Sequence, residues 1–438
     1  MNLPLNGRVA IIDDQIKQAE PLMKIFSKKQ IPFTYFSGES NYLPDEDDNL
    51  NDIRVLFLDI NLIDDSVQND KVLKGRLIPV LKRVISKDNY PYVIIYWSRH
   101  QNQSDKKLIE KEIFGNDLKD RKPIGFLSAV KSDFFNFDGS MTDDFEDKIG
   151  ELFNSINLLI SKSPVYSYLL NWENKVHLSA DKTLEEVFSN YNKFDNWSDN
   201  ANFIFNKLGV SFSGKSFANQ NAESRIKSSY NALNIVFADT LENNINNSNV
   251  PNPKKLSISA TAKNLESINN INKKLLISDE KEPLHYSGTV IEILDKKKTS
   301  NYENLLDAVL TDNGKKKKAE IILSWKKIWL NVTPLCDTVQ GKIVSHRLVS
   351  GILVVAFKDM KKAFHNNEAV YISPSFTYDK KDYAIIIDFR HFFTLPQLGK
   401  SKNRKSIFRI RQQLLAEIQS KLSRHINRQG VLFLDDRS

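Results

Sequence analysis

The sequence predicts a multidomain chain in which an α/β domain comes first, a helical region second and a β-rich region last. Short apolar runs alternate with helix-sized segments in the first third, and apolar residues recur at steps of three and four in the middle. The last third is rich in β-branched and aromatic runs. A chain of 438 residues is long enough for about two to four domains, each with its own core.

Five apolar runs in the first third are expected to form one parallel sheet within residues 1–138. Each run is bounded, and the segments between the runs are long enough for helices, which is typical of buried strands in a doubly wound sheet. We expect this domain to be flavodoxin-like, with its ligands at the carboxyl ends of the strands. The runs are residues 9–12, 33–36, 55–58, 93–96 and 124–130.

Polar side chains stand at the ends of four of these runs. Asp13 and Asp14 end the first run, Asp59 the third, Ser98 the fourth and Lys131 the fifth. Because the carboxyl ends of parallel strands share one edge, these side chains are expected to project into one crevice. Three carboxylates there would raise one another's pKa unless a cation neutralises them. Mg²⁺ is the natural candidate, since it prefers hard oxygen ligands.

This set of groups is suited to forming a phosphoaspartate. The carboxylate of Asp59 can attack phosphorus, the ammonium of Lys131 can pair with phosphoryl oxygens, and the hydroxyl of Ser98 can donate to another of them. An Asp-Asp pair taken alone is commonly a solvated turn or a helix cap. The prediction therefore depends on the whole set of residues.

Two segments resemble the signature segments of response-regulator receiver domains, the phosphoacceptor domains of two-component signalling. They are residues 11–15, with the sequence IIDDQ, and residues 56–62, with the sequence LFLDINL. The separation of Asp14 and Asp59 is also close to that of the family. The resemblance implies that Asp59 accepts a phosphoryl group from a histidine kinase.

The same resemblance implies a magnesium site. Its ligands would be Asp13, Asp14, Asp59 and the backbone carbonyl of Asn61. A degenerate receiver, which keeps the fold but no longer turns over phosphate, stays open as an alternative.

The chain departs from the family pattern after Asp59. Ser98 follows it at a longer interval than usual, so we expect an insertion to lengthen the helix around residues 71–87. Arg99 and His100 follow Ser98, where the family has a small residue. They could narrow access or clamp the phosphoryl group, although a place on the rim of the site is the more common outcome.

The family pattern includes a lysine near the last strand, and this sequence offers two candidates for it. Lys122 precedes a proline, as in the family, whereas Lys131 follows the last strand. We prefer Lys131, because the site requires a residue at the carboxyl end of a strand. Ser128 stands near the place of the family's aromatic switch residue, so the usual aromatic coupling is not expected.

The middle of the chain, residues 139–250, is predicted to be a helical interaction or spacer domain. One helix is expected from Phe145, a second after the start signal Ser163-Pro164, a third from Thr183 and a longer one over residues 224–241. No His/Glu or Ser/His set with catalytic spacing occurs there. An Asn-rich stretch follows, and residues 251–280 are expected to form a linker or helical connector.

Residues 281–398 are predicted to be β-rich, as a small barrel or a sandwich. In this region Cys336, Asp337 and His346 could form a nucleophile or metal site. A buried structural cysteine and a turn aspartate are the alternative. The segment faintly resembles a strand-ending Cys-Asp motif of uncharacterised bacterial proteins of phage defence. The expected strands are residues 285–294, 319–323, 328–332, 342–357, 369–372 and 383–389.

Residues 399–438 are predicted to form a basic C-terminal helix, with an apolar stripe that includes Ile407, Ile410 and Leu414. Its positive charges could form a solvated face or bind nucleic acid. No DNA-recognition helix stands out, so nucleic acid is not a favoured partner. The net charge of +8 does not decide this, because lysine is abundant throughout the chain.

The composition limits the kinds of site and the cellular location that we expect. One cysteine excludes an internal disulfide framework and a multi-cysteine zinc site. No stretch is apolar enough to span a membrane and no signal peptide is visible, so the expected location is the cytoplasm and no membrane partner is expected.

The favoured function is a receiver protein of a phosphorelay, acting as a signal switch or a phosphate sink. The atypical receiver with a long tail is similar to proteins of bacterial antiviral defence, including the two-component type known as Detocs, in which a receiver is thought to drain phosphate from the kinase. This resemblance implies a histidine kinase as partner, and another receiver or an effector protein beside it. No enzyme activity beyond phosphotransfer and autodephosphorylation is predicted. The alternative is a receiver-gated effector whose C-terminal β domain acts by hydrolysis or on nucleic acid.

Overall fold

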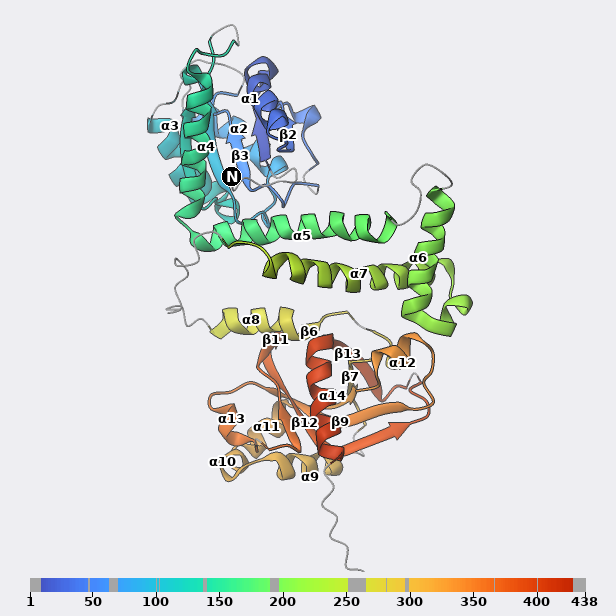
Figure 1. Cartoon of the computed structure of the whole chain (residues 1–438). Helices are drawn as coiled ribbons and strands as arrows, with labels where there is room; N and C mark the ends of the chain where they lie inside the picture. The colour runs from blue at the N-terminus through green and yellow to red at the C-terminus, as the bar shows by residue number, and fades with distance from the viewer. Residues whose placement is uncertain are drawn as a thin grey trace, which may run out of the picture. The chain divides into compact units, whose positions relative to one another are not determined.

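The computed structural model describes residues 9–45, 48–62, 70–99, 101, 103–136, 140–189, 197–250, 265–280, 282–295, 299–365, 367–399 and 401–427. It divides into two compact units (Figure 1). The first comprises Met1–Asp195 with Ile235–Ile258, and the second Asn196–Asn234 with Ser259–Ser438. The division falls within helix α7 (Ala222–Asn246), which therefore contributes one half to each unit.

A five-stranded parallel sheet forms the centre of the first unit, as predicted. The strand order is β2-β1-β3-β4-β5, so β2 lies on one side of β1, and β3, β4 and β5 follow one another on its other side. Every pairing is parallel and in register, for example Ile12 beside Leu58. The strands are β1 (Val9–Ile12), β2 (Phe33–Phe36), β3 (Val55–Leu58), β4 (Val93–Ser98) and β5 (Gly125–Val130).

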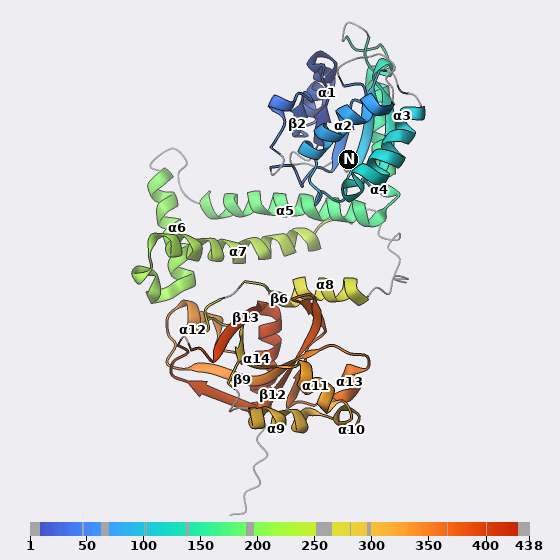
Figure 2. The same cartoon turned by 180° about the vertical axis from the view of Figure 1, so that it is seen from behind.

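Helices cover both faces of this sheet, which explains its continuous apolar strands. In β1, Val9 and Ile11 pack into one core cluster, and Ala10 and Ile12 into the other. Figures 1 and 2 show the sheet with its helices from two opposite sides. One face is covered by α1 (Ile16–Lys28) and α4 (Phe145–Ser161), the other by α2 (Asp70–Val84) and by α3 (Gln103–Leu108), which continues as the π-helix η2 (Ile109–Asp117).

The packing of α4 extends the α/β domain beyond its predicted end at residue 138. The apolar stripe of α4, from Phe145 to Ile160, lies in the same core cluster as Val9 and Trp97 of the sheet. Helix α4 is therefore a layer of the α/β domain, and the helical region begins after it. The stripe itself was predicted correctly, but its partner could not be read from its periodicity.

Helix α5 (Pro164–Phe188) starts at the predicted Ser-Pro signal and is fixed to the end of the sheet opposite the carboxyl ends of the strands. The hydroxyl of Tyr166 donates to the carbonyl of Arg54, just before β3, at 2.7 Å. The guanidinium of Arg54 donates two hydrogen bonds of 3.1 Å to the carboxylate of Glu173. A paired, planar contact of this kind fixes both partners in orientation.

The prediction that a helix starts at Thr183 is wrong, since Thr183 lies inside α5. Its hydroxyl donates to the carbonyl of Ser179 at 2.7 Å, one turn earlier in the same helix. Threonine can satisfy its hydroxyl this way within a helix, so the residue does not by itself mark a start.

The helical part of the second unit joins its sheet domain through a short turn. Helix α6 (Trp197–Ser213) is followed by the 3₁₀ turn η5 (Gly214–Asn219) and the first half of α7. The hydroxyl of Ser216 in η5 donates to the carbonyl of Val339 at 2.8 Å, at the end of α12 (Leu335–Val339). Helix α8 (Leu265–Leu276) leads into the sheet.

The C-terminal sheet is one curled antiparallel sheet of eight strands. Its strand path is β10-β12-β9-β8-β7-β13-β6, with β11 paired on β12. Within the described residues this path has two ends, at β10 and β6. The strands are β6 (Ile277–Ser278), β7 (Thr289–Ile293), β8 (Lys326–Asn331), β9 (His346–Val355), β10 (Val370–Ile372), β11 (Phe376–Tyr378), β12 (Lys381–Leu395) and β13 (Arg404–Ile410).

Both faces of this sheet are buried. Helix α14 (Gln412–Ile426) packs on one face through Leu414, Leu415, Ile418 and Leu422. The other face is covered by α9 (Thr299–Val309), α11 (Lys318–Ser324) and α13 (Met360–Ala363), with the short α10 (Asp312–Lys315) between them. The described helices include none with the length and apolar character that a membrane crossing requires.

Two predictions in this region are wrong. Residues 319–323 form part of helix α11 and not a strand, because burial is one-sided: Ile321 is buried while Leu323 is 89% exposed. The predicted C-terminal helix begins only at Gln412, since Arg404–Ile410 is strand β13. A β-bulge near Ile407 places Ile407, Phe408 and Ile410 in the same core, a pattern that imitates helical spacing. Residues 428–438 lie outside the described part of the chain.

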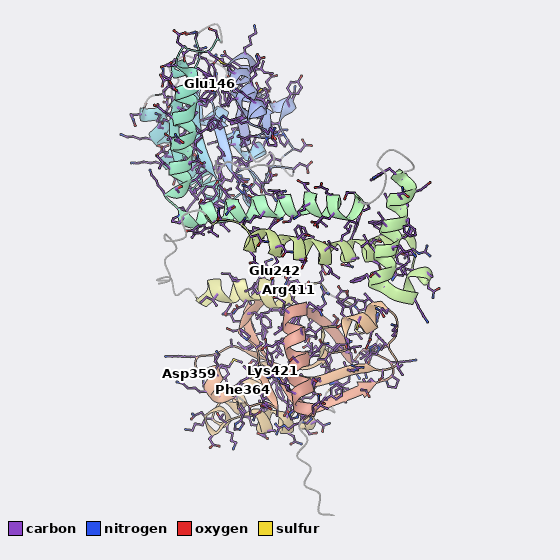
Figure 3. The ribbon with its side chains drawn as sticks, viewed as in Figure 1. Glu146, Glu242, Asp359, Phe364, Arg411 and Lys421 are labelled. Carbon is purple, nitrogen blue, oxygen red and sulfur yellow. The ribbon has the colours of Figure 1, made fainter. Side chains whose placement is uncertain are left out.

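Some of the basic residues near the C-terminus make contacts inside the sheet domain (Figure 3). Arg411 donates from Nε to the carbonyl of Ile277 at 3.1 Å. The ammonium of Lys421 lies 4.7 Å from the centre of the Tyr371 ring and 3.4 Å from the carboxylate of Glu417. These two charges therefore stabilise α14 on the sheet as well as facing solvent.

Candidate metal centre

The carboxyl ends of β1 and β3 bring two carboxylates side by side. Asp13 and Asp59 directly follow Ile12 and Leu58, which are paired neighbours in the sheet. The amide of Asp59 donates to the carbonyl of Ile12 at 2.8 Å, so the ladder continues to this residue. The amide of Asp13 donates to the carbonyl of Phe36 at 3.0 Å, which joins Asp13 to the end of β2 on the other side of β1. The backbone of the site is therefore set by the sheet itself.

Asp13, Asp14 and Asp59 form an acidic cluster that could hold a metal ion. Each offers one carboxylate oxygen, and these oxygens lie within 4.8 Å of one another. Asp13 is fully buried, Asp59 is 4% exposed and Asp14 is partly exposed. Carboxylate oxygens with one side open to water suit a hard divalent cation.

Burial raises the pKa of Asp13 from 3.8 to about 7. The nearby ammonium of Lys131 lowers it and the carboxylate of Asp59 raises it further. One lysine thus does not compensate fully for bringing these carboxylates together. A bound cation would supply the missing positive charge.

Asp59 is held by donors from three directions. Its Oδ1 accepts from the hydroxyl of Ser98 at 2.7 Å and from the amide of Asn61 at 2.9 Å. Ser98 in turn accepts from the amide of Ile60 at 2.6 Å, which orients its hydroxyl toward Asp59. The other oxygen, Oδ2, pairs with the ammonium of Lys131.

Lys131 is inserted into the centre of this site and is only 1% exposed. Its Nζ lies 2.7 Å from Oδ2 of Asp13 and forms an ion pair with it. It also donates to Oε1 of Gln18 at 3.1 Å. Lys122, the other candidate lysine, is exposed and precedes β5, at the opposite end of that strand.

Two glutamines belong to the site and were missed by the sequence reasoning. Gln18 lies on α1, and its side chain donates to Gln15 while accepting from Lys131. The Nε2 of Gln101 donates to the carbonyls of Ala129 at 2.8 Å and Tyr96 at 3.1 Å, so it joins the ends of β4 and β5. The only signal for Gln18 was its place one helical turn after the acidic pair.

Of the other three residues discussed around the phosphoryl position, the structure describes Arg99 and Ser128. Arg99 donates from Nη2 to the carbonyl of Asn136 at 3.2 Å. Ser128 is exposed on β5. His100 lies outside the described residues.

The C-terminal candidates do not converge in the same way. Cys336 is exposed on α12, and its thiol lies 3.6 Å from Oδ1 of Asp337. Asp337 lies 3.9 Å from Arg347, next to His346. Burial lowers the pKa of His346, with a smaller effect of His285. Among the described residues, no hydrogen bond or ion pair joins His346 to Cys336 or Asp337, and the three do not form a group that could share a metal ion.

Comparisons with known proteins add no family to this description. No protein-family model matches the chain, and no curated protein matches its sequence.

Proposed function

We propose that the α/β domain is a flavodoxin-like receiver domain and that Asp59 accepts a phosphoryl group from a histidine kinase in the cytoplasm. The observation that carries this proposal is the placement of Asp59. Its carboxylate lies close to those of Asp13 and Asp14 and is contacted by both Ser98 and Lys131. The strand order β2-β1-β3-β4-β5 supports it, because flavodoxin-like domains share that order and bind ligands at this edge.

The residues present fit Mg²⁺. Asp13, Asp14, Asp59 and the backbone carbonyl of Asn61 would hold it, and when bound it would neutralise charge on the incoming phosphoryl oxygens. An oxygen of Asp59 would attack phosphorus in line, forming the new O–P bond as the N–P bond to the kinase histidine breaks. The imidazole leaves with the electron pair of that bond.

Ser98 and Lys131 are placed to respond to the new group. A phosphoryl group on Asp59 adds about 1.5 to 2 negative charges to the site. The hydroxyl of Ser98 and the ammonium of Lys131 both contact the Asp59 carboxylate, so both can follow its oxygens. Movement of Lys131 toward the phosphoryl oxygens would break its contacts with Asp13 and Gln18 and so start the response.

Within this proposal the chain acts as a switch or as a phosphate sink, and its resemblance to atypical receivers supports a role in bacterial defence against phages. The lifetime of the phosphoaspartate distinguishes the two roles. A sink returns its phosphoryl group to water quickly, whereas a switch retains it. The receiver-gated effector is less favoured, because Cys336 and His346 are not joined in one site.

Beryllofluoride binding tests the proposal without knowledge of the kinase, because this ion mimics an aspartyl phosphate. With Mg²⁺ present, we expect a saturable rise in thermal stability of the wild-type protein and none in Asp59→Asn. Lys122→Ala is the matched control and should behave as the wild type. A wild-type protein that binds neither Mg²⁺ nor beryllofluoride would contradict an active receiver.

A further inference from the structure

A groove of about 350 Å³ lies where the last turns of α14 meet the sheet of the second unit. One wall is the C-terminal part of α14 together with its cap residue, Asn427. The other wall comes from β9, from β12 and from the residues that follow β8. The volume falls within the range of about 300 to 1,000 Å³ that is typical of binding sites.

Apolar side chains in this groove remain partly open to solvent. Ile426, on the last turn of α14, is 53% exposed. Phe392 and Pro334 are partly exposed on the sheet side. Below them Val332 and Leu422 are buried and belong to the core of the domain. The groove therefore extends the core to the surface, where a further apolar segment could cover it favourably.

One cation borders this apolar surface. Among the described residues that line the groove, Arg347 is the only charged one, and its side chain is 51% exposed. Its amide donates to the hydroxyl of Thr333 at 2.9 Å, and its carbonyl accepts from the amide of Val332 at 2.9 Å. Within the described residues, the ion pair of its guanidinium is a long one, 3.9 Å to Asp337. The backbone is thus fixed, while the guanidinium can still take an acidic partner.

The chain supplies a segment of matching chemistry directly after the groove. Asn427, which lines the groove, is followed by the C-terminal tail, residues 428–438, with the sequence RQGVLFLDDRS. In this tail an apolar run, residues 431–434, is followed at once by two aspartates. The run starts four residues after Asn427, a separation that the chain can span over at most about 14 Å. Gly430 stands before the run, where glycine permits the backbone to reverse after a helix.

We propose that this groove binds the chain's own C-terminal tail, through residues 431–436. The apolar run would cover the exposed side of Ile426, and Asp435 or Asp436 would pair with Arg347. A segment on a short linker has an effective concentration in the millimolar range, so even weak contacts would keep it bound. The groove does not include the proposed phosphorylation site, so neither proposal depends on the other.

Hydrogen exchange of the full chain, followed by mass spectrometry on the peptide that carries residues 431–434, tests this contact. We expect these amides to exchange about fivefold more slowly than in a synthetic peptide of residues 428–438, which corresponds to a tail that is bound about four-fifths of the time. Ile426→Glu places a charge in the apolar groove and should restore the rate of the free peptide. Leu323→Glu, at an 89% exposed position of α11, is the matched control and should leave the protection unchanged.

The acidic contact has its own measurement. Arg347→Glu should remove at least about half of the protection, because it faces the two aspartates with a like charge. Asp435→Arg with Asp436→Arg, added to Arg347→Glu, should restore the protection. Restoration by a charge exchange would show that the loss came from the contact and not from misfolding of the groove.

Three results would overturn the proposal. They are exchange of the wild-type run as fast as in the free peptide, equal loss of protection in Leu323→Glu and Ile426→Glu, and failure of the charge exchange to restore protection. Protection that disappears when the protein is diluted would assign the groove to the tail of a second copy, and would likewise overturn a contact within one chain.

Discussion

The two sheets of this chain place their polar residues by different rules. In the parallel sheet, residues far apart in sequence, such as Asp13, Asp59 and Lys131, meet because every strand ends at the same edge. In the antiparallel sheet, neighbouring strands end at opposite edges, and both faces are buried under helices. Cys336, Asp337 and His346, although near in sequence, do not form one group there.

The comparison indicates where sequence alone can locate a site. A polar residue after an apolar strand is informative only when the topology sends all such residues to one place. In the C-terminal domain, by contrast, one cavity is lined by residues of α9, β8, β9 and β12, which no short motif connects.

Loss of the buried lysine should have the largest effect on stability. Lys131→Ala leaves the carboxylates of Asp13 and Asp59 without their cation in a buried site, and we expect a loss of about 3 to 5 kcal/mol without Mg²⁺. Lys122→Ala, at the exposed opposite end of β5, should change stability by less than about 0.5 kcal/mol. Urea denaturation measures both. Equal effects of the two substitutions would contradict the role of Lys131 at the centre of the site.

The raised pKa of Asp13 predicts opposite effects of pH without and with Mg²⁺. Because the pKa rises from 3.8 in the unfolded chain to about 7 in the folded one, the stability that the protonated group contributes is lost progressively as pH rises from about 4 to about 7. Asp13→Asn should remove that loss. Mg²⁺ requires the ionised carboxylate, so its affinity should increase about tenfold between pH 6 and pH 8.

Thermal melts from pH 4 to pH 8, with and without Mg²⁺, measure both effects. A stabilisation by Mg²⁺ that does not change with pH, or a pH profile that is the same in Asp13→Asn, would show that Asp13 does not take part.

Gln18 should have a smaller effect, on phosphorylation and not on folding. Its Oε1 accepts from Lys131 at 3.1 Å, so Gln18→Ala removes the only neutral partner of this ammonium that the described residues show. We expect phosphorylation by acetyl phosphate to slow about threefold to tenfold, with stability changed by less than about 1 kcal/mol. Gln18→Glu should hold Lys131 in an ion pair and slow the reaction further. Lys17→Ala, exposed on the same helix, is the control and should react as the wild type.

The smallest effect is expected at Cys336. The thiol is exposed and has one long contact with Asp337, so Cys336→Ala should change stability by less than about 0.5 kcal/mol. Phosphorylation should be unchanged too. Loss of a biological output with phosphorylation intact would revive the effector hypothesis.

The parallel sheet was largely predictable because its strands are buried on both sides and bounded by polar residues. The predicted runs coincide with β1, β2 and β3, and nearly with β4 and β5. The preference for Lys131 over Lys122 followed from the same topology, and the structure places Lys131 among the acids. Gln18 and Gln101 could not be predicted, because they act through contacts between a helix or loop and distant strands.

The C-terminal region was predicted less well, for identifiable reasons. The bulge in β13 imitates the spacing of a helix, and the one-sided burial of α11 cannot be seen in a short apolar run. The packing of α4 on the first sheet depends on a partner that periodicity does not name. Tertiary contacts decided each of these elements.

The most direct test of the central claim is identification of the phosphorylated residue. Purified chain is incubated with Mg²⁺ and acetyl phosphate or a labelled histidine kinase, the acyl phosphate is trapped by borohydride reduction, and the modified peptide is sequenced by mass spectrometry. The account predicts modification of Asp59 in the wild type, none in Asp59→Asn, and unchanged modification in Lys122→Ala. Modification of another residue, or no modification together with no beryllofluoride binding, would contradict it.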